Sequence, residues 1–183
     1  MAGDILLGLP AMYIGGVLTV NLLVMMGHGD PKDAAIFNFL VGALTTVVAL
    51  MWLFGAGPTG NVTSSLVAAQ TLLFTFTYYW LGYNWYTGRQ DNRALGWYCL
   101  FVALNVIPFA YYAFVPASGP VLWILGLNWI LWGLAWFSFW VVLGLQKNSF
   151  FKPMLAITWV ATIVVWISGL GWLLGWFNFS GLT

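Results

Sequence analysis

Residues 5–55 decide the fold. They read ILLGLPAMYIGGVLTVNLLVMMG (5–27), HGDPKD (28–33) and AAIFNFLVGALTTVVALMWLFG (34–55), a short polar turn between two apolar stretches. Each stretch has the roughly 20 residues that an α-helix needs to cross a bilayer. Four similar stretches follow, at 64–86, 95–115, 121–145 and 153–176. The sequence therefore predicts an all-α membrane protein, a single domain over residues 1–183 with six transmembrane helices.

The composition excludes a soluble domain. Of the 183 residues, 62% are hydrophobic and 5% are charged, whereas a soluble domain carries roughly 25% charged residues. The net charge of +1 comes from basic residues scattered singly over short turns, which offers no surface for nucleic acid. The lipid bilayer is the partner that this composition predicts.

All five basic residues fall in alternate connections between the apolar stretches. They are Lys32, Arg89, Arg93, Lys147 and Lys152. Short loops that carry Lys and Arg stay cytoplasmic, so both termini are predicted to be periplasmic. The regular recurrence of basic turns predicts three two-helix hairpins. These repeat in parallel, because each hairpin starts and ends on the same side.

Ionisable groups are absent from mid-membrane depth in every predicted span. Glu does not occur in the chain, Asp4 stands at the outer edge of the first span, and His28, Asp30 and Asp33 belong to the first basic turn. Proton-coupled carriers need ionisable groups inside the membrane, metal sites need clustered ligands, and covalent catalysis needs a nucleophile beside a base. We therefore expect no enzyme activity, no metal and no cofactor.

Aromatic residues make up 19% of the chain, with 13 Trp, 14 Phe and 8 Tyr. Those near span ends fit the aromatic belt of a membrane interface, namely Trp80, Trp85, Tyr86, Trp97, Tyr98, Trp172 and Trp176. In 121–145 the tryptophans recur every three or four residues and share a helical face: Trp129, Trp132, Trp136 and Trp140. Trp132 falls near the middle of its span. Core packing and a polar slot both remain open explanations for this face.

A second face in 64–86 matches the tryptophan face. Phe74 and Tyr78 are four residues apart, with threonines nearby. Four amides also lie inside spans: Asn21, Asn38, Asn105 and Asn128. Each taken singly is expected to bond to the next helix. A slot of aromatic faces and neutral hydrogen-bonding groups suits a small, flat, uncharged solute such as urea or a short-chain amide, which is one candidate among several small-solute pathways.

Six short motifs occur in order along the chain. They are DPK (30–32), FNFLVG (37–42), LFTFTY (73–78), WYCLFVALNVIP (97–108), WILWGLAW (129–136) and PMLAI (153–157). Together they resemble the AmiS/UreI family of bacterial urea and short-chain amide channels. The similarity is collinear from Tyr13 to Trp172.

The resemblance implies a urea or amide channel in the bacterial inner membrane. It further implies three hairpins surrounding a pore within each protomer, and protomers assembled as a homohexamer. Carried over by position, the residues lining that pore would be Phe74, Tyr78, Trp129, Trp132, Trp136, Ile14 and Leu18.

Two departures from the family pattern bear on gating. The acid-gated member of the family has His and carboxylates in its outer loops, whereas residues 56–63 and 116–120 here have neither. That member also carries a Glu in its sixth helix, where Trp159 stands in this chain and could narrow the pore. We therefore expect a channel that is not acid-gated.

Two other functions compete with a channel. A Trp-rich membrane protein could hold a hydrophobic ligand such as a porphyrin as a sensor. Five spans and a cytosolic terminus would favour that function, whereas six spans with both termini outside do not. A proton-coupled small-solute carrier is the third possibility, and the missing ionisable residues count against it.

Overall fold

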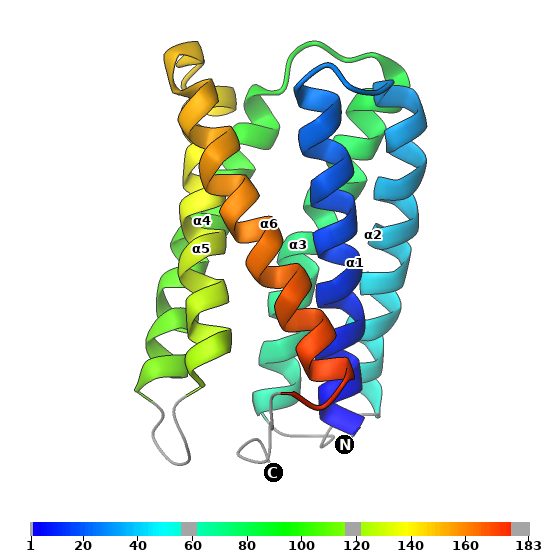
Figure 1. Cartoon of the computed structure of the whole chain (residues 1–183), viewed down its shortest axis with the longest axis vertical. Coiled ribbons are helices and arrows are strands. Elements are labelled where there is room, and N and C mark those ends of the chain that lie inside the picture. Colours follow the sequence, from blue (N-terminus) through cyan, green and yellow to red (C-terminus); the bar gives the residue numbers. More distant parts are fainter. Residues whose placement is uncertain (1, 56–61, 116–121, 177–183) are drawn as a thin grey trace.

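The computed structural model describes residues 2–55, 62–115 and 122–176, and these ranges are all-helical with six long helices (Figure 1). The helices are α1 (Ala2–Met25), α2 (Pro31–Phe54), α3 (Val62–Thr87), α4 (Arg93–Phe114), α5 (Trp123–Phe139) and α6 (Phe151–Leu173). A π-helical turn, η1 (Trp140–Gly144), continues α5, and a 3-10 turn, η2 (Asn148–Phe150), precedes α6. Every predicted span therefore corresponds to a helix with similar bounds.

Within the described ranges, five helices are long and apolar enough to cross a membrane, and α3 is the exception. It has 26 residues, but its threonines, tyrosines and amides lower its hydropathy. Its polar side chains bond within the bundle instead: Thr75 donates to Thr45 of α2 at 2.8 Å, and Thr71 donates to the Val67 carbonyl. Satisfying polar groups internally is the condition for placing them in a bilayer.

Packing between helices does not follow the predicted hairpins. The most extensive contacts are α2 with α3, α1 with α6 and α4 with α5, whereas α1 with α2, α3 with α4 and α5 with α6 meet over smaller areas. The predicted hairpins therefore describe the path of the chain, while the most extensive packing joins helices of different hairpins. Small residues explain the difference, because they allow close approach: Gly42 lies against the Tyr79 ring, and Gly169 lies against the backbone of Met12.

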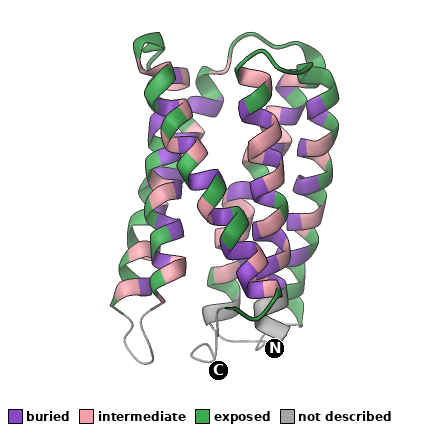
Figure 2. Ribbon diagram, in the orientation of Figure 1, coloured by how far each residue is buried: buried purple, intermediate pink, exposed green. Residues whose placement is uncertain are grey.

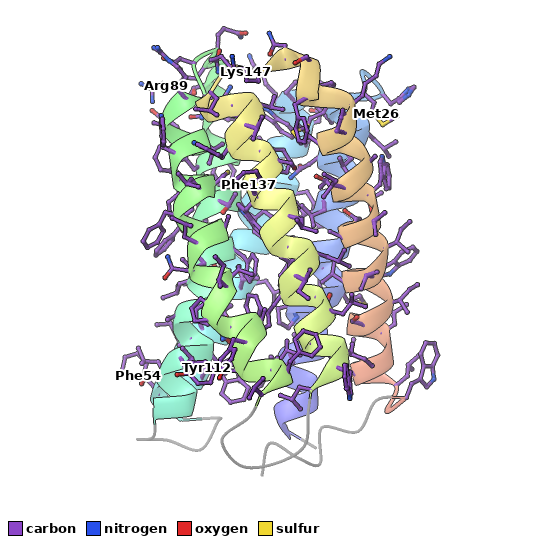
Figure 3. The ribbon with its side chains drawn as sticks, turned by 90° about the vertical axis from the view of Figure 1, so that its left-hand side faces the viewer. Met26, Phe54, Arg89, Tyr112, Phe137 and Lys147 are labelled. Atoms are coloured by element: carbon purple, nitrogen blue, oxygen red, sulfur yellow. The ribbon has the colours of Figure 1, made fainter. Side chains whose placement is uncertain are left out.

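The three basic turns meet at one end of the bundle. Figure 1 shows the α1–α2, α3–α4 and η1–α6 connections together, with the start of α1 and the end of α6 opposite. Figure 3 shows Arg89 and Lys147 at the basic end, and Phe54 and Tyr112 towards the other. Asp30, directly before Pro31, caps α2 and accepts from the Lys32 N–H at 2.7 Å. The alternation read from the sequence is thus present in space.

Buried residues face the inside of the bundle and exposed ones form its outer surface (Figure 2). Amides join helices across this interior. Asn21 of α1 and Asn38 of α2 exchange two hydrogen bonds, of 3.0 and 2.7 Å. Asn128 of α5 donates to Ser168 of α6 at 2.9 Å. The expected bonding to a neighbouring helix is confirmed for these three, while Asn105 bonds to the Phe101 carbonyl of its own helix.

Candidate functional site

A closed aromatic cluster lies between α3 and α5. The Phe74 ring is its hub, with centroid distances of 5.7 Å to Trp129, 4.8 Å to Trp132 and 4.6 Å to Trp136. Trp129 and Trp132 also meet edge to face at 4.9 Å. Spacings of three and four residues on α5 place all three indoles on the side that faces α3. Tyr78 stands one turn from Phe74, and all five side chains are at most 5% exposed.

The predicted residues of α1 belong to the larger buried core that contains this aromatic cluster. Ile14 is buried in it, and Leu18 is partly buried and packs against it. Between them Val17 is completely buried in the cluster, a position that the sequence reading did not single out. Its valine side chain gives no signal that separates it from the many other apolar residues of its span. All seven predicted site residues therefore lie in or against one extended buried core, and their role in lining a pore stays a prediction.

Two tryptophans are placed differently from the sequence prediction. Trp172 was expected in the interfacial belt, but it is 3% exposed and belongs to the central cluster. The prediction was wrong because α6 crosses the bundle obliquely towards α1 (Figure 1), so its last turn is covered. Trp140 was expected to continue the α5 face. It opens the π turn and its ring instead meets Trp97 of α4 at 5.8 Å.

Trp159 does not narrow this cluster. Its side chain is half-buried, and it is not among the partly buried residues that pack against the cluster. The positions of α6 that face inward beside it are Thr158 and Thr162, which donate to the Met154 and Thr158 carbonyls. The expected effect of Trp159 on the slot is therefore not supported by its position.

Two polar atoms in the cluster have no hydrogen-bond partner among the described residues. They are Nε1 of Trp132 and the hydroxyl oxygen of Tyr78, and both are shielded from solvent. Buried polar groups are nearly always paired, and an indole N–H or a phenol in an apolar site seeks a partner. These atoms offer one donor and one donor–acceptor among ring faces. They can bind a polar solute without any charge.

The chemistry of the site follows from this inventory. The aromatic faces can cover a flat molecule, while the indole N–H and the phenol hydroxyl can bond to its polar edges. An ion entering such a neutral slot would lose its hydration without compensation. Unpaired neutral polar atoms among aromatic rings, inside a multi-span helical bundle, fit the class of membrane transport proteins.

Comparison with known proteins places the chain within that class. Residues 6–176 match the family model described as AmiS/UreI family transporter. The chain belongs to the AmiS/UreI family, and it is a multi-pass membrane protein of a transporter family rather than an enzyme.

Two curated relatives are similar to much of this chain. A putative amidate substrates transporter protein of Mycolicibacterium smegmatis is 33% identical over 78% of this chain, and the match spans only 64% of that protein's length. The acid-activated urea channel of Helicobacter pylori strain J99 is 32% identical over 92% of this chain and 97% of its own.

The solved structures agree on the architecture. The cryo-electron microscopy structure of the Helicobacter pylori urea channel in a closed state superposes with a TM-score of 0.78 at 28% identity. The superposition covers 94% of this chain and 100% of that chain. The helix arrangement is therefore shared with a solved urea channel over nearly the whole molecule.

Proposed function

We propose that this protein is a passive channel for urea and short-chain aliphatic amides in the bacterial inner membrane. The observation that carries the proposal is the unpaired Trp132 Nε1 and Tyr78 hydroxyl, buried among the rings of Phe74, Trp129 and Trp136. The names of the relatives, a urea channel and an amidate transporter, point to the same solutes. The whole chain forms one channel domain, and protomers assemble as a homohexamer.

The slot would recognise such a solute by shape and by neutral hydrogen bonds. The indole N–H of Trp132 donates to the carbonyl oxygen, and the hydroxyl of Tyr78 accepts from an amino group. Ring faces cover the flat surfaces of the solute, with Ile14 and Leu18 closing the side formed by α1. Binding without charge stays weak, so the solute can leave again.

Passage requires the rings to move apart. Phe74 lies within 4.8 Å of Trp132 and 4.6 Å of Trp136, centroid to centroid, which leaves no room between them for a solute. Side-chain rotation and loop motion cover picoseconds to microseconds, fast enough to open a slot transiently during conduction. Each solute therefore passes only while the rings are apart, and the slot acts as a selectivity filter.

Stopped-flow light scattering on proteoliposomes tests the proposal. Urea and acetamide should enter protein-containing vesicles faster than empty ones, and the rate should rise in proportion to the solute gradient. A saturating rate that depends on a proton gradient would indicate the carrier instead. Absence of urea or acetamide flux together with tight binding of a porphyrin would indicate the ligand-binding protein.

Flux should change little when external pH falls from 7 to 5. The outer connections, most of which lie outside the described residues, contain no His or carboxylate at 56–63 and 116–120, and His is the side chain that titrates in this range. At the basic end, hydrogen bonds from Arg93 lower the pKa of the Asp91 carboxyl to about 2. That carboxylate therefore stays charged throughout. Steep activation near pH 5 would contradict the ungated channel and direct attention to Asp4.

The basic end of the bundle is assigned to the cytoplasm. Positive loops are retained on that side, so a reporter fused after Thr183 should read periplasmic and one inserted within 89–93 should read cytoplasmic. Alkaline phosphatase and a fluorescent protein give opposite signals on the two sides. The reverse pattern at both positions would overturn the orientation, and with it the direction in which a solute meets the slot.

A further inference from the structure

The carboxamide of Asn128 is fully buried and only half paired. Its Nδ2 donates to the Ile124 carbonyl at 2.8 Å and to the Ser168 hydroxyl at 2.9 Å. Its Oδ1 has no partner, although the residue has no exposed surface. A carbonyl can only accept, so the Ile124 contact fixes the amide with its nitrogen on that side. The unpaired atom is therefore the acceptor oxygen.

Clamping two helices together does not require an unpaired oxygen. Asn21 and Asn38 each donate and each accept across the α1–α2 contact. Asn84 also leaves its Oδ1 unpaired, but it lies at the end of α3 and bonds to Asn92 of the basic turn. Asn128 holds α6 through its nitrogen alone, and its oxygen is kept away from any protein donor. A buried acceptor without a partner costs stability. That cost is expected for an acceptor whose partner is a solute rather than a protein group.

Asn128 has a neighbour on α5 with an unpaired donor. Asn128 and Trp132 are four residues apart on α5, so they are neighbours on one face, about 6 Å apart along the helix axis. Trp132 Nε1 also lacks a partner in the protein. Because α5 starts at the end opposite the basic turns, Asn128 lies one turn nearer to that end than Trp132.

We infer that Asn128 and Trp132 form a two-point binding site for a carboxamide group. Asn128 Oδ1 accepts an N–H of the solute, and Trp132 Nε1 donates to its carbonyl oxygen. Urea and primary amides carry this donor and acceptor on one flat edge, so the pair recognises them together. The Ile124 carbonyl holds the Asn128 nitrogen and thereby presents the oxygen. The inference rests on the proposed function and names Asn128 as a specificity residue of that slot.

The replacement Asn128→Leu removes the oxygen with little change in volume. Folding should tolerate it, because the Ser168 hydroxyl keeps its own bond to the Val164 carbonyl and an unpaired buried acceptor disappears. Urea and acetamide flux per reconstituted protein should fall about threefold to tenfold, the effect of one lost hydrogen bond. The melting temperature in detergent should stay the same or rise. If Asn128 only clamped the two helices, Asn128→Leu would leave the flux unchanged and lower the melting temperature.

Two further variants separate recognition from clamping. Ser168→Ala removes the helix clamp but leaves Asn128 bonded to Ile124, and Asn105→Leu removes an amide that bonds only within α4. Both should conduct within about twofold of the parent, less than one hydrogen bond contributes. Unchanged flux in Asn128→Leu would overturn the inference, as would an equal loss in Ser168→Ala. A parent protein that conducts neither solute would instead refute the proposed function itself.

Discussion

Replacing Trp132 with alanine is expected to admit bulkier amides while the protein still folds. The indole fills the space between Phe74 and Trp129, with ring centroids 4.8 and 4.9 Å away. Truncating a tryptophan in a sealed core costs about 3–5 kcal/mol because an empty cavity remains. If the lost volume joins a solute path, water can occupy it and the cost should be smaller. Relative fluxes of urea, acetamide and larger amides, with detergent melting, measure both effects on one variant.

Trp52→Ala provides a matched control. Trp52 is also 5% exposed with an unpaired Nε1, but it lies in a separate cluster with Leu6, Val48 and Ala68. Its truncation should destabilise the protein as a core cavity does and leave the order of solute fluxes unchanged. If Trp132→Ala behaves in the same way, with severe destabilisation and an unchanged order, then Trp132 is core and the slot assignment is wrong.

The helices and their ends could be predicted because they depend on local chemistry. Span length, the Asp30 cap and the charged turns each depend on a few adjacent residues. The observed helix bounds agree closely with the predicted spans. The same holds for the α5 face, since Trp129, Trp132 and Trp136 repeat with the helical period and all three contact Phe74. Periodicity predicts which side chains share a face.

Periodicity alone does not predict which helix that face meets. The pairing of α1 with α6 depends on close approach at Gly169, and it covers Trp172, which stands near a span end in the sequence. Trp140 keeps the helical spacing, since its N–H bonds to the Trp136 carbonyl, but its ring meets Trp97 of α4. The pattern ends there because a π turn follows, in which the Leu145 N–H bonds five residues back to Trp140. A wider turn of this kind breaks the 3.6-residue pattern without any marker residue.

Gly96→Ala is expected to destabilise the helix bundle more than the other glycine-to-alanine replacements. Gly96 of α4 faces the π turn, and an added Cβ would lie 2.6 Å from the Gly144 Cα and 2.7 Å from the Leu143 carbonyl carbon. These are backbone atoms, so no rotamer change can relieve the overlap. Overpacking typically costs about 1–3 kcal/mol and occasionally more. The yield of folded protein and its melting temperature should both fall.

Gly16→Ala is the matched control for that effect. Its added methyl would meet the Phe37 ring at 3.4 Å, an ordinary contact, and alanine is favoured over glycine in a helix by up to about 1 kcal/mol. It should therefore melt at or above the parent temperature. Equal stability of Gly96→Ala would mean that α4 and the π turn are not in contact. The π turn carries Trp140 and directly follows the Trp129–Trp136 face, so this contact also sets where that face stands relative to α4.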